Sequence, residues 1–399
     1  MEKRATEITI AHLVTPYLFR TGSWIHAQLI HPCGVRSIVL TQRLEDPAAF
    51  PFAPIFLTTA SLGRLGRIRN RLLHLAGSYE PKLYLPILRR EGAALLHAHL
   101  GWEGALALAV ARASGLPLIT SFYGRDAGLL PRYPWWRARF RRLFAEGDLF
   151  LVEGPALAGR LRDLGCPREK IRVLHLGIDV AQIPFRERHP APGGAAEILV
   201  SASFRPKKGV PAAVRAFAEV APAFPAARLR ILGDGPERPA VLAAVRRAHL
   251  GDRVLLEGYV SHARHLEAMQ QADLFLAPSR TAPDGDSEGG APVALIEAQA
   301  TGLPVIATRH ADIPEVVAAG ASGLLSPEFD DGALARNLEW MLANPERWAE
   351  MGRRGRERIE AEFDIRRRAC EAARIYLETA RAGSGRAPRA SALVGHEDV

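Results

Sequence analysis

Two glutamates, Glu288 and Glu297, flank a glycine-containing loop and the start of a helix-like run, PVALIEAQA. Gly289, Gly290 and Ala291 precede this run, where free backbone N–H groups bind anions and small side chains let a ligand come close. Because a carboxylate repels phosphate, we expect both glutamates to accept hydrogen bonds from hydroxyl groups, of a ribose at Glu297 and of a sugar at Glu288. The alternative is a surface glutamate and one that stabilises the helix.

A basic turn in the stretch SASFRPKKGVPAAV follows a strand-like run that ends at Ser203. It contains Arg205, Lys207 and Lys208, and Gly209 then opens a helix whose free amides add partial positive charge. This combination suits a diphosphate, although a solvated basic turn explains the same residues. The two stretches together predict a cradle for a phosphate and a sugar.

These residues require a scaffold of strands and helices, and apolar strand-like runs alternate with helical patterns along the chain. Such a pattern predicts parallel sheets covered on both faces. Segment 186–197 combines charge, proline and glycine and is typical of a linker. We therefore expect an α/β fold with two doubly wound domains, at 1–188 and 195–362. Ligands bind outside the carboxyl ends of such strands, which favours a site in a cleft between the domains.

The end of the chain has a different character. Its helical pattern predicts a helix at about 364–380 that crosses back to the first domain. Residues 382–399 are small and polar and include proline, so we expect a disordered tail.

Length and composition exclude several classes of protein. The chain of 399 residues suits two cores, and it has no uncharged apolar run near the roughly 18 residues of a membrane span. Its charged N-terminus lacks the features of a signal peptide, which indicates a cytoplasmic protein. The three cysteines, Cys33, Cys166 and Cys370, are far apart and without metal-ligand spacing, so we expect reduced packing thiols.

The net charge of +9 is unevenly distributed. Residues 1–190 hold 26 Lys and Arg against 15 Asp and Glu, a balance of +11, which indicates an anionic partner. Nucleic acid is disfavoured because no matching motif occurs. The stretch RYPWWRARFRRLF, residues 132–144, would as a helix separate its large apolar side chains from its arginines. Such a helix suits peripheral contact with an anionic membrane surface, and packing on the domain core explains it equally well.

A set of motifs in the second half resembles the retaining glycosyltransferases of family 4, which have the GT-B fold. Within that family the sequence is similar to the bacterial exopolysaccharide branch, of colanic-acid and amylovoran type. The likeness covers residues 170–330 and, more weakly, most of the first half. The motifs are VLHLGIDV (173–180), KKGV (207–210), ILGDGPER (231–238), LEGYV (256–260), LAPSR (276–280), SEGGAPVALIEAQATGLPVIATRHADIPEVV (287–317) and SGLLSP (322–327).

The resemblance implies a role for each matching residue. Lys208 would bind the donor diphosphate, the backbone of Val260 the nucleobase, and Glu297 the ribose. Glu288 and the backbone of 289–293, which includes Val293, would hold the donor sugar and its β-phosphate. Two positions depart from the family. Ser203 replaces an arginine, so we expect Arg205 to supply the guanidinium, and eight residues instead of seven separate the glutamates.

The segment 95–128 resembles the acceptor-domain part of the family, with Tyr123 in place of a strand-end histidine that contacts the donor sugar. A phenol donates one hydrogen bond but is no base at pH 7, since its ordinary pKa is about 10. His97 and His99 alternate onto one face of a neighbouring strand, either as a group near the site or as buried structural histidines. Asp126 is a further candidate on the acceptor side.

Near the N-terminus, Gly22 lies in a strand–helix turn whose backbone amides could face the donor phosphate.

The resemblance implies a metal-independent, cofactor-free transfer of a hexose from a nucleoside-diphosphate sugar to a saccharide or lipid-linked acceptor. Lys208, Glu288, Tyr123 and Arg205 are the expected catalytic residues. Mainly, the enzyme must stabilise charge developing on the diphosphate. Two alternatives remain open: another GT-B enzyme, such as a nucleotide-sugar epimerase or a phosphorylase, and a non-catalytic sugar-nucleotide-binding protein.

Overall fold

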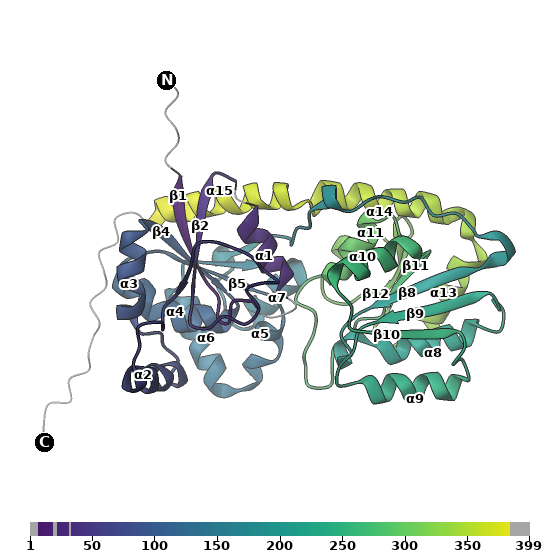
Figure 1. The fold of residues 1–399 in the computed structure, drawn as a ribbon, viewed down its shortest axis with the longest axis horizontal. Helices are drawn as coiled ribbons and strands as arrows, with labels where there is room; N and C mark the ends of the chain where they lie inside the picture. Colours follow the sequence, from purple (N-terminus) through teal and green to yellow (C-terminus); the bar gives the residue numbers. More distant parts are fainter. Residues whose placement is uncertain (1–6, 19–21, 32, 384–399) are drawn as a thin grey trace, which may run out of the picture. The chain divides into compact units, whose positions relative to one another are not determined.

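Two units, each built on a parallel β-sheet, make up the computed structural model, which describes residues 7–18, 22–31 and 33–383 (Figure 1). Within the described residues, unit 1 comprises 7–152, 158–174 and 366–383, and unit 2 comprises 153–157 and 175–365. The predicted α/β architecture with two doubly wound sheets is confirmed.

The sheet of unit 1 has seven strands in the order β3-β2-β1-β4-β5-β6-β7, and every neighbouring pair is parallel. The strands are β1 (Ile8–Leu13), β2 (Val35–Thr41), β3 (Ile55–Leu57), β4 (Ala93–His99), β5 (Leu118–Phe122), β6 (Leu149–Val152) and β7 (Ile171–Val173). The helices are α1 (Ser23–Ile30), α2 (Arg64–Leu75), α3 (Pro81–Arg90), α4 (Gly101–Ser114), α5 (Arg125–Gly128), α6 (Pro134–Glu146), α7 (Pro155–Asp163), most of which lies in this unit, and α15 (Ile365–Gly383).

The last helix, α15, belongs to unit 1 although it follows all of unit 2 in the sequence (Figure 1). Its residues Ala372, Ile375 and Tyr376 pack into a core cluster with Ile10 and Leu95 from the sheet. An apolar helix face completes the cover of a sheet that is buried on both sides. The predicted tail lies outside the described residues, apart from its first positions, which end α15.

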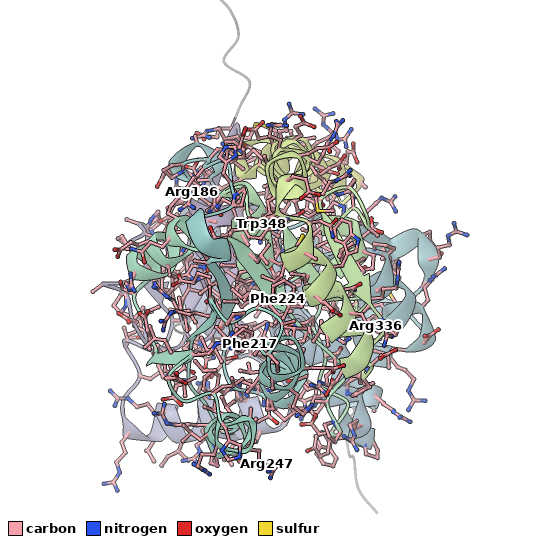
Figure 2. The ribbon with its side chains drawn as sticks, turned by 90° about the vertical axis from the view of Figure 1, so that its right-hand side faces the viewer. Arg186, Phe217, Phe224, Arg247, Arg336 and Trp348 are labelled. Atoms are coloured by element: carbon pink, nitrogen blue, oxygen red, sulfur yellow. A yellow bond between two sulfur atoms is a disulfide. The ribbon has the colours of Figure 1, made fainter. Side chains whose placement is uncertain are left out.

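The sheet of unit 2 has six strands in the order β10-β9-β8-β11-β12-β13, again all parallel. Its core contains Phe217 and Trp348, whereas Arg247 and Arg336 project outward (Figure 2). The strands are β8 (Ala196–Ser201), β9 (Ala227–Leu232), β10 (Val254–Gly258), β11 (Leu274–Ala277), β12 (Val305–Thr308) and β13 (Gly323–Ser326). The helices are α8 (Val210–Val220), α9 (Arg238–Ala248), α10 (His262–Gln271), α11 (Val293–Ala300), α12 (Ile313–Val316), α13 (Asp331–Ala343) and α14 (Trp348–Glu362).

The boundary between the units differs from the expected one at residue 188, because 175–188 belongs to unit 2. Ile178 and Ile183 pack into a core cluster of that unit. Arg188, expected in a solvated linker, is buried, and its guanidinium donates to the carbonyls of Ala272 (3.1 Å) and Met269 (2.6 Å). Burial lowers the pKa of Arg188 to about 9. Composition alone gives no sign that these carbonyls surround the arginine.

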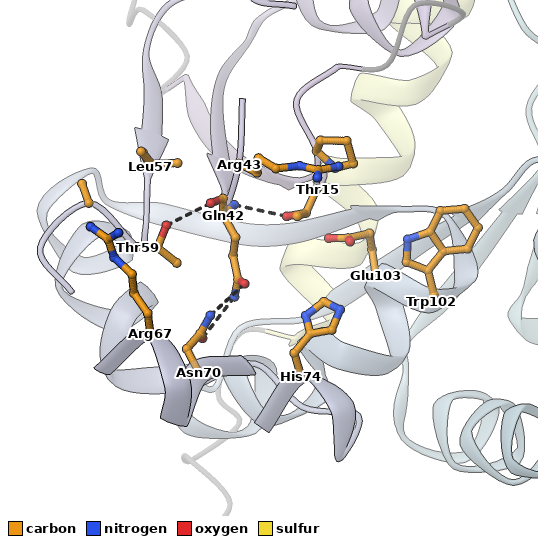
Figure 3. A pocket seen from close by; sticks show the side chains of 12 residues that line it. Thr15, Gln42, Arg43, Leu57, Thr59, Arg67, Asn70, His74, Trp102 and Glu103 are labelled. Atoms are coloured by element: carbon orange, nitrogen blue, oxygen red, sulfur yellow. Dashed lines mark hydrogen bonds between the residues drawn. The ribbon is translucent and has the colours of Figure 1, made fainter. Parts of the chain in front are cut away.

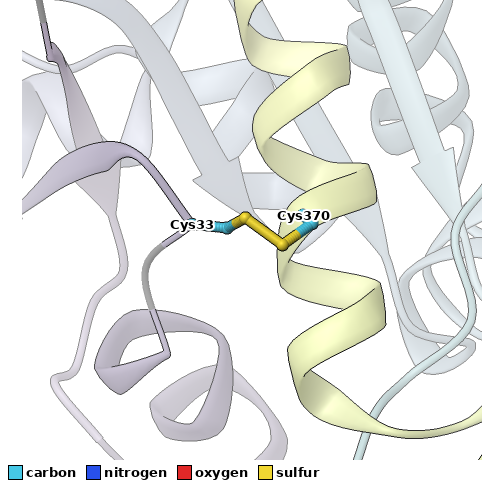
Figure 4. Close-up of a disulfide and its surroundings, with 2 residues drawn as sticks. All are labelled: Cys33 and Cys370. Carbon is cyan, nitrogen blue, oxygen red and sulfur yellow. A yellow bond between two sulfur atoms is a disulfide. The ribbon is translucent and has the colours of Figure 1, made fainter. Parts of the chain in front are cut away.

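The expectation of three reduced cysteines is wrong for two of them. A disulfide joins Cys33 to Cys370 of α15, across 337 positions of sequence (Figure 4). The fold brings α15 beside the turn that precedes β2, which spacing along the chain does not reveal. Cys166 is a buried free thiol, as expected of a packing residue. No helix in the described part of the chain is long and apolar enough to span a membrane.

Candidate functional site

The strand order of unit 2 reverses between β8 and β11, so the loops that follow these two strands diverge at a topological switch point. Lys208 lies in the loop after β8, and Glu288 lies in the loop after β11. The Nζ atom of Lys208 is 2.7 Å from Oε1 of Glu288. The structure thus brings together the basic turn and the glycine-containing loop.

A glycine lets the two loops approach. Gly209 has a φ of +61°, and a Cβ at this position would collide with the carbonyl oxygen of Pro278, which follows β11. The neighbouring Lys207 is held by Asp286 (3.2 Å) and by the carbonyl of Ser287 (3.0 Å). Lys207 therefore links the loop after β8 to the loop after β11, and Lys208 is the lysine that contacts Glu288.

Glu288 is a buried, ionised hydrogen-bond acceptor. Ser279 donates to its Oε1 (3.0 Å), and its own backbone N–H donates to Nε2 of His310 (3.1 Å). Burial pushes the pKa of Glu288 upward, but the charges of Lys208 and Lys207 outweigh this and hold the pKa below its ordinary value. A carboxylate in this state accepts hydrogen bonds from hydroxyl groups.

Two histidines of α10 hold Glu297, which lies in α11. His262 and His265 place Nε2 at 2.8 Å and 2.9 Å from the two carboxylate oxygens, and Ser201 contacts Nδ1 of His265 (2.8 Å). Although burial opposes ionisation, these hydrogen bonds lower the pKa of Glu297 to about 2. Glu297 is therefore a fixed anion whose remaining lone pairs can accept from a diol.

The small residues ahead of α11 lie where they were expected. Gly289 and Gly290 are buried, Ala291 is half-buried, and α11 begins at Val293. A Cβ on Gly290 would collide with the side chain of Glu153, which belongs to the same unit. The loop therefore has no room for larger residues at this position.

Three other predicted donor residues, Ser203, Arg205 and Val260, follow the carboxyl ends of strands β8 and β10 in the same sheet. Ser203 is half-buried in the turn after β8, whereas Arg205 is exposed. Between these two residues, Phe204 donates its backbone N–H to the carbonyl of Asp234 in the turn after β9 (2.8 Å). Val260 follows β10 and packs against the core.

In unit 1, Tyr123 is connected to a chain of buried histidines. Its hydroxyl lies 2.8 Å from Nδ1 of His99, whose Nε2 lies 3.0 Å from Nδ1 of His12. The other nitrogen of His12 contacts Ser37 (3.2 Å). His99 is thus buried inside a hydrogen-bonded chain that ends at the hydroxyl of Tyr123. Burial lowers the pKa of His12 to about 3 and that of His99 well below its usual range, so both rings are neutral.

His97 completes this group, since its nitrogens contact Ser121 (2.7 Å) and Tyr376 of α15 (2.8 Å). Among the described residues, His12, His97 and His99 form the one group whose ligand atoms are near enough to share a metal ion. However, each of their six ring nitrogens already has a partner in the protein. The arrangement is that of a neutral hydrogen-bonded network.

Asp126, predicted on the acceptor side, is hydrogen-bonded to the backbone of the turn after β5. It is buried, and its carboxylate accepts from the backbone N–H groups of Gly101 (2.8 Å), Tyr123 (3.1 Å) and Gly124 (3.0 Å). Burial outweighs these hydrogen bonds and raises the pKa of Asp126 to about 6. The residue therefore shapes the turn that presents Tyr123. Gly22 is the N-cap of α1.

Most of the chain matches known family models. Residues 28–182 match the model described as Glycosyltransferase Family 4, and residues 182–358 match Glycosyl transferases group 1. The amylovoran biosynthesis glycosyltransferase AmsK of Erwinia amylovora is 32% identical over 327 residues, which are 82% of this chain and 78% of AmsK. The chain belongs to the family 4 glycosyltransferases.

Two further comparisons agree with this membership. WcaL of Escherichia coli, named for colanic acid biosynthesis, is 37% identical over 271 residues, 67% of this family 4 chain. The match spans 66% of the length of WcaL, slightly less than two thirds. The crystal structure of Anabaena Alr3699/HepE in complex with UDP has a TM-score of 0.72 at 18% identity and covers 93% of this chain and 100% of that one. This likeness shows a shared GT-B fold.

The family 4 glycosyltransferase also has a pocket of about 740 Å³ within unit 1 (Figure 3). Gln42 lies at its centre and is fixed by hydrogen bonds with Asn70 (3.0 Å), Thr59 (2.9 Å) and Thr15 (3.3 Å). The walls come from the loops after β1, β2 and β3 and from α2 and α4. The lining residues are Thr15, Pro16, Gln42, Arg43, Leu57, Thr59, Ala60, Arg67, Asn70, His74, Trp102 and Glu103.

The charge of this pocket is positive at neutral pH. Arg43 and Arg67 are cationic, whereas burial raises the pKa of Glu103 to about 8 and keeps its carboxyl protonated. Tyr79 donates a hydrogen bond to that carboxyl (2.7 Å). The pocket therefore combines two guanidinium groups with neutral polar groups, a composition that suits an anionic ligand.

Sequence reasoning missed the residues that support the two glutamates, namely His262, His265 and His310. His262 and His265 are three positions apart at the start of a helix, which places them on one side, and this spacing was the available signal. A further omission is Arg280, whose backbone N–H donates to the carbonyl of Lys207 (2.8 Å) and whose guanidinium lies near Gly209.

Proposed function

We propose that the protein is a retaining glycosyltransferase that moves a hexose from a nucleoside-diphosphate sugar to a saccharide or lipid-linked acceptor, in exopolysaccharide biosynthesis. The observation that carries the proposal is the Lys208–Glu288 pair at the switch point of unit 2. The names of AmsK and WcaL support the pathway, and the UDP complex of Alr3699/HepE supports a nucleotide-sugar donor.

In the proposed complex the diphosphate lies at Lys208 and Arg205, near Ser203 and Gly22, and against the amides of 289–291. Glu297 accepts hydrogen bonds from the ribose, and the backbone of Val260 contacts the base. Glu288 holds hydroxyls of the hexose. Each charged group then has a partner of the opposite sign or a hydroxyl donor, as a buried ligand requires.

The proposed reaction breaks the bond between the anomeric carbon and the diphosphate oxygen. The acceptor hydroxyl oxygen forms its bond to that carbon on the same face, and its proton passes to the departing phosphate oxygen. Lys208 stabilises the charge that develops on the diphosphate. Tyr123, oriented by His99, donates a hydrogen bond to the hexose. We propose that neither a metal ion nor a cofactor takes part.

The pocket of unit 1 is the proposed acceptor site. Arg43 and Arg67 suit a diphosphate that links a saccharide to a lipid, and Gln42 and Asn70 suit sugar hydroxyls. We accordingly propose a cytoplasmic location at the inner face of the membrane. The positive balance of the first 190 residues supports this placement.

A panel of nucleoside-diphosphate sugars tests the proposal, first by thermal shift to find the donor and then by product release with candidate acceptors. We expect release of free nucleoside diphosphate only when acceptor is present, and the same rate after EDTA treatment. Turnover without acceptor favours an epimerase or a phosphorylase. Binding without turnover on every acceptor favours a non-catalytic binding protein. Loss of activity in EDTA that Mn²⁺ or Mg²⁺ restores contradicts metal independence.

A further inference from the structure

Helix α2 lies at the edge of unit 1 (Figure 1), and one side of it is an exposed apolar stripe. Leu65, Ile68, Leu72 and Leu75 are 83%, 51%, 61% and 66% exposed. Their spacing of three or four residues places them within an arc of about 80° on the helix. Asn70, the buried residue of α2, lies on the opposite side. The stripe thus faces solvent, away from the fold.

Arginines border this stripe on both sides. By the same helical spacing, Arg64 and Arg71 lie along one side and Arg69 along the other. Arg64 and Arg71 are exposed, Arg69 pairs with Glu80, and α2 itself contains no acidic residue. An exposed apolar stripe between cationic borders is the pattern of a helix that lies in the interface of an anionic bilayer.

The aromatic and arginine-rich segment that sequence analysis associated with a membrane forms α6, and its apolar side is largely used by the protein core. Phe140, Leu143 and Phe144 are buried. Arg139 of α6 instead donates to the carbonyl of Leu75 at the end of α2 (2.8 Å). The helix α6 therefore packs on the domain core and fastens α2, which carries the stripe.

The geometry points to α2 as a membrane-binding helix, with the acyl–headgroup boundary of an anionic bilayer as its occupant. Leu65, Ile68, Leu72 and Leu75 enter the bilayer, and Arg64 and Arg71 contact lipid phosphates. Arg67, Asn70 and His74, on another side of the same helix, line the pocket of unit 1. A lipid-linked acceptor held in the membrane would therefore find this pocket beside α2, a step that rests on the proposed function.

The size of the stripe favours a bilayer over a second protein. Twelve residues of α-helix are about 18 Å long, and a stripe roughly 10 Å wide gives an area on the order of 200 Å². A stable protein partner buries about 800 Å² on each side. A bilayer needs no matching shape, and it supplies the negative charge that the arginines require.

Flotation of the full chain with lipid vesicles tests the inference. Vesicles of pure phosphatidylcholine are compared with equal mixtures of phosphatidylcholine and phosphatidylglycerol. We expect binding to the anionic vesicles, weakened by added NaCl. The variant L65S/I68S/L72S/L75S should lose affinity by about tenfold or more, and R64Q/R71Q by about tenfold. The matched controls are L255S, at an exposed leucine of β10, and R246Q/R247Q on α9, which should bind as the wild type does.

Two results overturn the inference: no binding of the wild type to anionic vesicles, or α2 variants that float as well as the wild type. Affinity for nucleoside diphosphates, measured on the same variants, should be unchanged and shows that the fold is intact. Glycosyl transfer is assayed separately. If no acceptor is glycosylated but flotation depends on α2, the proposed function fails while the membrane-binding helix stands.

Discussion

Lys208 Nζ lies 2.7 Å from Oε1 of Glu288, across the point where the strand order of unit 2 reverses. Both side chains are largely buried, so each neutralises the other in the protein without donor. A diphosphate that enters must share the lysine with the glutamate. The proposed donor site is therefore stabilised by the same lysine charge that it would offer to the ligand.

Replacing Lys208 by alanine is expected to weaken the binding of a nucleoside diphosphate by about tenfold to a hundredfold, as expected for the loss of a charge-assisted hydrogen bond. Isothermal titration calorimetry measures the change. The matched control is Lys207→Ala, which removes a lysine already held by Asp286 and should change the affinity much less. Equal affinities of wild type and Lys208→Ala contradict the assignment.

Glu288→Gln should weaken the binding of the nucleotide sugar and not that of the nucleoside diphosphate. The nucleoside diphosphate alone should bind as tightly as before or more tightly, because Lys208 no longer shares its charge with a carboxylate. The nucleotide sugar should lose roughly tenfold, since an ionised acceptor for its hydroxyls is gone. Calorimetry with both ligands provides the comparison. A fall in affinity for the diphosphate alone would show that Glu288 acts there instead.

The Glu297 cluster predicts a titration that NMR can follow. The hydrogen bond with Glu297 raises the pKa of His262 above 6.5, against a smaller opposing effect of burial. The His262–Glu297 interaction therefore contributes all of its stabilising free energy below the unfolded pKa of about 6.5. This contribution is lost as pH rises through the folded pKa of His262. Glu297→Gln should lower the pKa of His262 and weaken ribonucleotide binding by about tenfold. An unchanged histidine pKa in this variant contradicts the hydrogen bond.

Tyr123→Phe removes a hydroxyl that His99 orients and should lower kcat by about tenfold or more while leaving KM for the donor nearly unchanged. Tyr123→His, which introduces the residue typical of the family, should retain more activity than phenylalanine does. The measurement is steady-state kinetics at saturating donor. A phenylalanine variant as active as the wild type would limit Tyr123 to a structural role.

The protonated carboxyl of Glu103 predicts a dependence of stability on pH. Because burial raises its pKa from 4.5 to about 8, folding becomes less favourable as pH rises through this interval. Glu103→Gln removes that effect, so the melting temperature of the variant relative to the wild type should rise by roughly 5 °C between the two ends of the interval. Thermal unfolding at each pH measures the difference. A constant difference would mean that Glu103 is ionised in the fold.

Much of the site was predictable because it depends on local sequence. Glycines and lysines in the sequence indicate the turns that follow strands, and parallel sheets place such turns at one edge. The ends of β8 and β11, with Lys208 and Glu288, could therefore be inferred to meet. The two sheets could be predicted for a related reason, since buried strands read as continuous apolar runs.

Contacts between distant segments were beyond such reasoning. His12 and His97 are register partners on adjacent strands, and Tyr376 reaches His97 from a helix 279 positions away. No repeating pattern of residues in the sequence indicates either contact. The same holds for Arg188, whose partners are carbonyls of any residue type. Sequence reasoning identified groups able to do chemistry, but not which of them the fold would bury.

The bond between Cys33 and Cys370 turns most of the polypeptide into a macrocycle, since every strand from β2 to β13 lies between these two residues. Among the described elements, β1 and α1 at the front and the remainder of α15 at the back extend from it as arms. One backbone cleavage anywhere between the two cysteines would open the macrocycle without dividing the molecule. Both halves of such a nicked protein stay tethered until the sulfurs are reduced.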